Sequence, residues 1–118
     1  MRLEDLRKEL AQDKVRAAYL LVGVEPLLRD DAFTAIRGAV LSPAEESFNR
    51  DRLSGASTTP AALRNAVDSL PVMARRRLVL LRDPDTGRGA AKALSDALGE
   101  VLAEVAGQQQ TVLVVSTA

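Results

Sequence analysis

The stretch Ala-Tyr-Leu-Leu-Val-Gly-Val-Glu-Pro, residues 18–26, contains signals for a strand, a tight turn and the start of a helix. Ala18–Val22 is a continuous apolar run of strand length, which is typical of a buried strand. Gly23 ends the run, and Pro26 stands where helices favour proline, in the first turn. Apolar residues then recur at helical spacing, namely Leu28, Ala32, Ala35, Ile36 and Ala39. The stretch therefore predicts a buried strand that leads directly into a helix.

The same alternation continues on both sides of this stretch. Three more strands are predicted by apolar or alternating runs, at Phe48–Leu53, Leu78–Leu81 and Thr111–Val115. The first of these is weak and is interpreted as a short strand or sheet edge. Further helices are predicted at residues 3–12, 60–70 and 91–107, with a loop at residues 42–47. Apolar strands that alternate with helices are typical of a parallel sheet covered on both sides. The predicted fold class is therefore α/β, with three layers and helices on both faces of a parallel sheet.

Composition excludes several classes of site. The chain has 118 residues, with 16 Lys and Arg balanced by 16 Asp and Glu, and it contains neither His nor Cys. Without imidazoles and thiols there is no Ser-His-Asp triad, thiol nucleophile, disulfide or ordinary zinc site, which leaves only oxygen-ligand metal chemistry. Zero net charge gives no long-range field to attract DNA or an anionic membrane. The longest apolar run, Ala17–Val24, is far shorter than the ~20 residues that span a bilayer. We therefore expect a soluble protein with at most an indirect role at nucleic acids.

The length of the chain predicts one small compact domain, residues 1–118. The chain stops three residues after the apolar run that ends at Val115, and no helix follows to cover that side of the sheet. We therefore expect this domain to be a fragment of a longer chain whose further domains are absent.

The turn after the first strand is the usual position of a phosphate-binding loop. A P-loop that starts at Gly23 would continue, after four residues, with Gly, Lys and Ser or Thr. Those three places are held by Leu28, Arg29 and Asp30. Leucine blocks the close approach of phosphate to the backbone, and Asp30 carries negative charge where a hydroxyl should meet Mg²⁺. Glu25 also repels phosphate from the helix N-terminus. The sequence therefore predicts a degenerate P-loop that binds no nucleotide.

Two weaker signals for metal or anion binding follow the predicted strand Leu78–Leu81. Asp83 stands where NTPases of this architecture keep a magnesium ligand, but it also suits a cap for the turn Asp83-Pro84-Asp85. Gly87 and Gly89 flank an arginine, yet glycines in a turn before a helix need no ligand to explain them. We therefore favour a structural role for both segments.

Residues Leu70-Pro-Val-Met73 lie between the end of a predicted helix and the basic run Arg75–Arg77. In one interpretation, Leu70 is the last core residue of its helix, while Val72 and Met73 cover the sheet edge. In the other, an exposed apolar plug on a proline-stiffened turn inserts into a hydrophobic pocket of a partner. The arginines are interpreted as a solvated face or as partners for acids rather than as a DNA site. Composition and spacing leave both interpretations of the apolar residues open.

An ordered set of motifs resembles the N-terminal domain of the delta subunit of bacterial DNA polymerase III, which belongs to the clamp-loader complex. The motifs are Tyr19-Leu-Leu-Val-Gly-Val-Glu-Pro-Leu-Leu28, Phe48-Asn with Gly55, Ser69-Leu-Pro-Val-Met-Ala-Arg-Arg-Arg-Leu-Val-Leu-Leu-Arg-Asp83, and Thr111-Val-Leu-Val-Val115. In this order they cover essentially the whole chain. The resemblance implies an AAA+-like domain that has lost nucleotide binding and uses no cofactor or metal, as the residues at the degenerate P-loop also indicate.

The resemblance also implies a set of partners. Leu70, Val72 and Met73 would dock into the hydrophobic cleft of the ring-shaped sliding clamp, the beta subunit, and help to open the ring for loading onto primed DNA. Met73 stands where the family often has an aromatic residue, so the expected affinity for the clamp is lower. Sister subunits, delta prime and gamma or tau, would be contacted through the missing domains and would hydrolyse ATP. The expected location is the bacterial cytoplasm, at the replisome on the nucleoid.

Two other functions remain open at this point. One is a P-loop ATPase subunit of a related clamp loader, degenerate or active, that uses Arg29 and Asp83. The other is a purely structural α/β module that makes no contact with a clamp. Binding of ATP distinguishes the first from a clamp-binding domain, and the effect of changing Val72 and Met73 distinguishes the second.

Overall fold

The computed structural model describes residues 2–84, 91–108 and 110–117. Strands and helices alternate along the chain. The elements in chain order are α1 (Leu3–Ala11), β1 (Ala18–Val22), α2 (Pro26–Val40), α3 (Pro43–Asn49), β2 (Arg50–Ser54), α4 (Pro60–Asp68), β3 (Arg77–Arg82), α5 (Ala91–Ala106) and β4 (Thr111–Thr117). None of the helices in these described ranges is long and apolar enough to cross a membrane.

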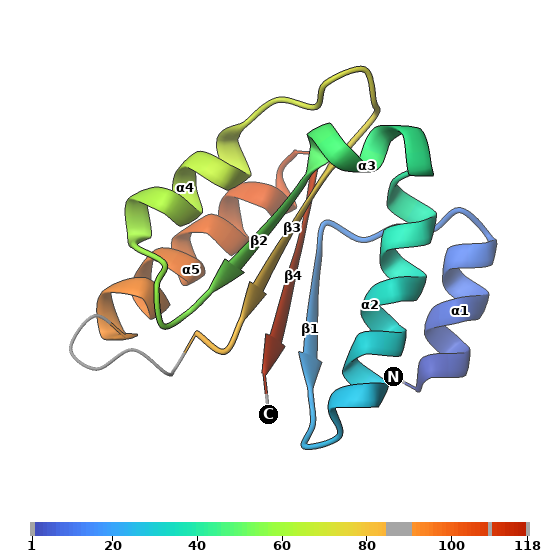
Figure 1. Cartoon of the computed structure of the whole chain (residues 1–118), viewed down its shortest axis with the longest axis horizontal. Helices are drawn as coiled ribbons and strands as arrows, with labels where there is room; N and C mark the ends of the chain where they lie inside the picture. Colours follow the sequence, from blue (N-terminus) through green and yellow to red (C-terminus); the bar gives the residue numbers. More distant parts are fainter. Residues whose placement is uncertain (1, 85–90, 109, 118) are drawn as a thin grey trace.

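The strands form one parallel sheet in the order β1-β4-β3-β2. Figure 1 shows α1 and α2 on one side of this sheet and α4 and α5 on the other. The predicted three-layer α/β fold is therefore confirmed, and β2 lies at a sheet edge as the sequence indicates. Because all strands run in the same direction, their carboxyl ends meet at one edge of the sheet, at the bottom of Figure 1. Their amino ends meet at the opposite edge.

The core consists of two layers, one on each face of the sheet. On one face, Leu80 belongs to a buried cluster with Ile36 of α2. On the other face, Val79 belongs to a second cluster with Leu63 of α4 and Val101 of α5. Successive side chains of a strand point to opposite faces, so a strand that is covered twice is apolar at nearly every position. Burial of each such side chain contributes about 1.5–3 kcal/mol to folding.

The buried face of α2 differs from the apolar stripe that the spacing predicts. Ala32 and Ile36 are buried as predicted, and Phe33 and Val40 are buried with them. Leu28, by contrast, is 58% exposed. The physical reason is its place in the first turn of α2, where it lines an open surface cavity together with residues of β1 and lies outside the buried core.

Residues 42–49 contain a helix, α3, where the sequence analysis expects a loop and the start of a strand. Oε1 of Glu45 accepts a hydrogen bond from the backbone N–H of Ser42 at 2.8 Å. This hydrogen bond holds the pKa of the Glu45 carboxyl below its ordinary value. The Ser-x-x-Glu spacing is that of a capping box, a stronger signal for a helix start than the alternation that follows is for a strand. Phe48 and Asn49 consequently end α3, and the expected strand is shorter.

Gly55 lies where the loop after β2 passes close to the end of β3. Its backbone N–H donates to the carbonyl oxygen of Arg82 at 2.7 Å. A Cβ atom at this position would lie 2.0 Å from the backbone oxygen of Asp83. We therefore expect Gly55→Ala to lower the free energy of unfolding by about 1–3 kcal/mol, because the backbone must shift. Urea or thermal denaturation measures this loss.

Gly38 in α2 provides the matched control. No atom lies within 4 Å of a Cβ added there, and alanine is favoured over glycine inside helices by about 0.5–1 kcal/mol. Gly38→Ala should therefore leave stability unchanged or raise it. Equal effects of the two substitutions would contradict the close approach of Gly55 to Asp83.

Candidate functional site

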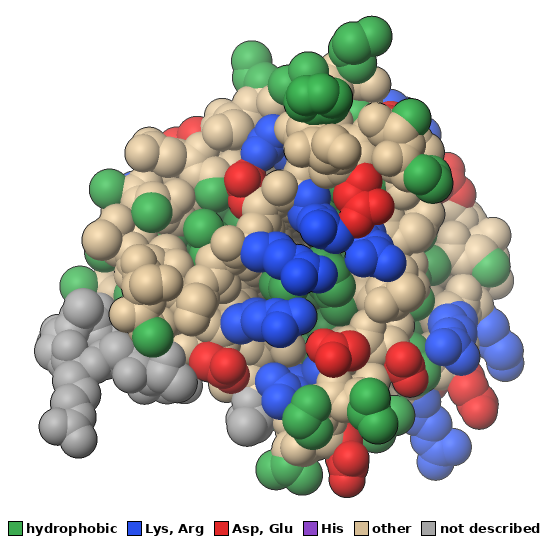
Figure 2. Space-filling model, in the orientation of Figure 1, with side chains coloured by type: hydrophobic (Ala, Val, Ile, Leu, Met, Phe, Trp, Pro, Cys, Tyr) green, Lys and Arg blue, Asp and Glu red, His purple; other side chains and the backbone are tan. Residues whose placement is uncertain are grey.

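The apolar loop, residues 69–76, connects α4 to β3 at the amino-terminal edge of the sheet (Figure 1). Leu70, Val72 and Met73 are 69%, 48% and 97% exposed. Figure 2 shows hydrophobic side chains that protrude at this end of the molecule, at the top of the view. The three side chains therefore lie together on the surface, and Leu70 does not belong to the core of its helix.

The end of α4 explains why Leu70 lies outside the helix. α4 ends at Asp68, and the carbonyl oxygen of Asn65 accepts hydrogen bonds from both the backbone N–H (3.1 Å) and the hydroxyl (2.7 Å) of Ser69. Pro71 disfavours a helical conformation at the residue before it. The helix therefore stops two residues earlier than the spacing predicts, and Leu70 lies beyond its end with an exposed side chain.

The middle of the apolar loop is bound by a side chain of α3. Asn49 is 0% exposed, and its Nδ2 donates to the carbonyl oxygens of Val72 (2.9 Å) and Glu45 (2.8 Å). Its Oδ1 accepts a hydrogen bond from the backbone N–H of Val72 at 2.6 Å. The next residue of the loop, Met73, has a left-handed backbone conformation with φ of 52°. A single buried amide thus joins α3 to the exposed apolar residues.

The first residue of β3, directly after the loop, is also joined to α3. The guanidinium of Arg77 donates from Nη1 to the carbonyl oxygen of Phe48 at 2.9 Å and forms an ion pair with Asp51. The Phe48 side chain itself is 68% exposed. Sequence reasoning missed the proximity of Phe48 and Asn49 to the apolar loop because it assigned them to a strand. The capping box at Ser42 could have placed both residues on a helix.

The degenerate P-loop lies at the opposite edge of the sheet, where the strands have their carboxyl ends. The backbone N–H of Gly23 donates to the carbonyl oxygen of Thr117 at 3.1 Å. Nη1 of Arg29, in the place of the P-loop lysine, lies 3.4 Å from Oγ of Ser116 and 4.0 Å from Oδ1 of Asp83. The structure therefore brings the two residues considered for an ATPase, Arg29 and Asp83, into contact with each other.

Asp30 is likewise engaged with a neighbouring strand. Its Oδ1 lies 3.8 Å from Nη2 of Arg82, at the end of β3. Leu28 projects from the first turn of α2 and is exposed, as described above. The residues in the three P-loop positions therefore comprise one exposed leucine and two charged side chains that pair within the protein.

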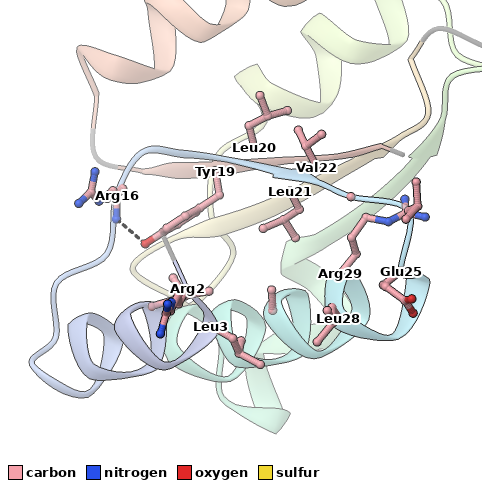
Figure 3. A pocket seen from close by; sticks show the side chains of 14 residues that line it. Arg2, Leu3, Arg16, Tyr19, Leu20, Leu21, Val22, Glu25, Leu28 and Arg29 are labelled. Atoms are coloured by element: carbon pink, nitrogen blue, oxygen red, sulfur yellow. Dashed lines mark hydrogen bonds between the residues drawn. The ribbon is translucent and has the colours of Figure 1, made fainter.

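A surface cavity of about 720 Å³ lies between α1, β1 and the start of α2 (Figure 3). Its lining is mainly apolar, with Leu3, Tyr19 and Leu21 among its residues. Arg29 and Glu25 stand at one end, and at the other the hydroxyl of Tyr19 accepts a hydrogen bond from the backbone N–H of Arg16 at 2.9 Å. The end of the cavity next to Gly23 thus presents the carboxylate of Glu25 and the guanidinium of Arg29, which already contacts Asp83.

The remaining candidate ligands follow β3. Asp83 has a φ of 49°, and its backbone N–H donates to the carbonyl oxygen of Ser116 at 2.8 Å. Asp85, with which Asp83 was expected to form a turn, and the pair Gly87 and Gly89 lie outside the described residues. Within residues 2–84, 91–108 and 110–117, no group of three or more His, Cys, Asp or Glu side chains could hold a metal ion.

Comparison with known families shows to which family this chain belongs. The model of the family described as "DNA polymerase III, delta subunit" matches residues 19–118. The chain belongs to the DNA polymerase III delta subunit family. The resemblance derived from the ordered motifs is therefore confirmed, and the match includes both the degenerate P-loop and the apolar loop.

Solved structures share the fold of this delta-family chain. The Bacillus subtilis DNA clamp loader delta protein has a TM-score of 0.79 and 21% sequence identity, covering 98% of this chain and 35% of that one. A DNA polymerase III, gamma subunit-related protein from Thermotoga maritima has a TM-score of 0.64 and 17% identity, covering 99% of this chain and 39% of that one. This chain thus spans little more than a third of the length of either protein. No curated protein matches its sequence significantly.

The exposure of the apolar loop in this delta-family chain predicts a difference between two leucines that are close in sequence. Leu63 in α4 is 0% exposed, whereas Leu70 is 69% exposed. Leu63→Ala should therefore lower the free energy of unfolding by about 2–5 kcal/mol, and Leu70→Ala by less than about 0.5 kcal/mol. Urea denaturation of the two variants measures both values. A large loss for Leu70→Ala would place this side chain in the core.

Proposed function

We propose that this chain is the AAA+-like first domain of a clamp-loader delta subunit and that it binds the sliding clamp through the apolar loop. It helps to open the clamp ring for loading onto primed DNA, and it does not bind ATP itself. The observation that carries this proposal is the exposure of Leu70, Val72 and Met73 on one loop of a delta-family chain.

The contact with the clamp is hydrophobic. Met73 is 97% exposed, so nearly its whole side chain is available for burial in a partner. Complete burial of a Leu, Val or Met side chain contributes about 1.5–3 kcal/mol, and a few such anchors at the centre of an interface supply most of its binding energy. Methionine adapts its shape to a pocket more readily than a ring does. These properties support a small protruding anchor that enters a hydrophobic cleft.

Opening of the ring follows from differential binding. A ligand shifts an equilibrium between two states only by the difference between its affinities for them. The domain therefore favours the open clamp if the apolar loop fits the open form of the cleft better than the closed form. No chemical step is required of this chain.

The charged residues at the degenerate P-loop support the absence of ATP binding. In a P-loop NTPase the lysine reaches the phosphates and an acid helps to hold Mg²⁺. Here Arg29 is directed toward Asp83 and Ser116, and its Nε is buried without a hydrogen bond within the described residues. ATP hydrolysis then belongs to the sister subunits, gamma or tau, which with delta prime contact the parts of the protein outside this chain. Contact with DNA is indirect, and the complex acts in the bacterial cytoplasm.

Removal of the exposed anchors tests the contact with the clamp. We expect Val72→Ser combined with Met73→Ser to weaken binding of the chain to its own organism's purified sliding clamp by about 100-fold or more, since two interface anchors are lost. The thermal midpoint should stay nearly unchanged, because both side chains are exposed. Surface plasmon resonance and thermal denaturation provide the two measurements.

The matched control removes two exposed apolar side chains from the other edge of the sheet. Val24 and Leu27 are 83% and 75% exposed, so Val24→Ser combined with Leu27→Ser changes surface hydrophobicity to a similar extent. This control should bind the clamp as the unchanged chain does. Unaltered clamp binding after removal of Val72 and Met73 would overturn the proposal.

Calorimetry tests the second part of the proposal. Titration of the chain with ATP and Mg²⁺ should give no saturable heat at millimolar nucleotide, because the place of the lysine is taken by an arginine that pairs with Asp83. Saturable binding that is lost in Arg29→Ala would favour an ATPase subunit of a related clamp loader instead.

A further inference from the structure

Asn49 is a completely buried polar residue whose side chain, among the described residues, forms hydrogen bonds only with backbone groups. Both hydrogens of its Nδ2 are used, one toward Glu45 and one toward Val72, and its Oδ1 accepts from Val72 as well. The orientation of the amide is determined by this network, since an N–H requires an acceptor and the two carbonyls require donors. The Asn49 side chain therefore pairs with both the N–H and the C=O of one residue, as a neighbouring strand would.

The apolar loop has few other bonds of this kind. Among the described residues, no backbone–backbone hydrogen bond involves the segment between Ser69, which is bonded to Asn65, and Arg77, which donates to Gln110. A segment without backbone pairing retains much conformational entropy unless side chains restrain it. The two bonds from Asn49 to Val72 supply that restraint in the middle of the loop.

The backbone of Met73 shows that the loop is held in a specific shape. Its φ of 52° is in the left-handed region, which a residue with a long side chain adopts only where its surroundings enforce it. Val72 immediately precedes it and is held on both sides by Asn49. The bond from Arg77 to Phe48 holds the end of the loop against the same helix. In this shape the Met73 side chain projects fully into solvent.

We infer that Asn49 is a positioning residue for clamp binding: it holds the apolar loop in its protruding conformation before the clamp is met. This inference rests on the proposed function and adds a residue to it. Asn49 is 0% exposed, so its side chain is not available for direct contact with the clamp. Its contribution to affinity comes through the loop, because a loop that is already ordered loses less entropy when it binds.

The variant that tests this inference most directly is Asn49→Ser. Glu45 lies four residues before Asn49, and a serine hydroxyl in a helix commonly bonds the carbonyl at this distance. The substitution therefore keeps the bond within α3 and removes both bonds to Val72, which serine is too short to reach. We expect hydrogen exchange at the Val72 amide to become at least about tenfold faster, and the dissociation constant for the clamp to rise about tenfold.

Thr58→Val is the matched control for general destabilisation. Thr58 is 8% exposed, and its hydroxyl donates to the carbonyl oxygen of Ser54 at 2.5 Å, in the loop after β2. This change also removes a buried bond from a side chain to the backbone, but at the other end of the sheet. It should lower the thermal midpoint while Val72 exchange and clamp affinity stay unchanged.

The outcomes separate this inference from the proposed function. If Asn49→Ser leaves exchange at Val72 unchanged, or weakens clamp binding no more than Thr58→Val does, Asn49 is not a positioning residue. Exchange at Val72 is measured on the chain alone and so stays informative even if the clamp does not bind. Asn49→Ala replaces Asn49→Ser if the latter fails to fold, because it also removes both bonds to Val72 and leaves no polar side chain at this buried position. With this variant the same rise in exchange and dissociation constant is expected.

Discussion

Every side chain from Leu78 to Leu81 in β3 and from Val112 to Val115 in β4 is buried, so these two strands need apolar cover on both faces of the sheet. Helices α1 and α2 supply it on one face, and α4 and α5 on the other (Figure 1). Parallel strands can be joined only by connections that cross from one end of the sheet to the other. This double burial therefore determines the alternation of elements and gives the sheet two edges of different character.

The two edges differ in chemistry. At the carboxyl ends of the strands, where α/β proteins commonly bind phosphates, the charges of Arg29 and Asp30 are directed toward residues of β3 and β4 or the residue after β3. At the amino ends, the apolar loop exposes Met73 to solvent. One edge thus pairs these charges within the protein, while the other edge presents hydrophobic surface. This distribution supports the proposal that the chain binds a protein partner and does not transfer phosphate.

Much of the fold and part of the site can be predicted from the sequence. The strands that contain Leu80 and Val114 are predicted well because burial on both faces leaves a continuous apolar run. The start of α3 is missed because its signal, the capping box of Ser42 with Glu45, is a local hydrogen bond and not a periodicity. Spacing assigns Leu28 to the apolar stripe of its helix and leaves Leu70 open between core and surface, but each lies in or beyond a terminal turn of its helix and is exposed.

The sequence by itself determined the α/β class, the loss of the P-loop residues and the family, because each depends on residue types at fixed spacing. Only the tertiary structure decided whether Leu70, Val72 and Met73 lie inside or outside, since apolar side chains near a helix end suit either place. It also decided that Asn49 meets Val72, 23 positions further along the chain. Hydrogen bonds between segments so far apart leave no period or spacing in the sequence. The two partners meet only when the fold brings α3 and the loop after α4 together.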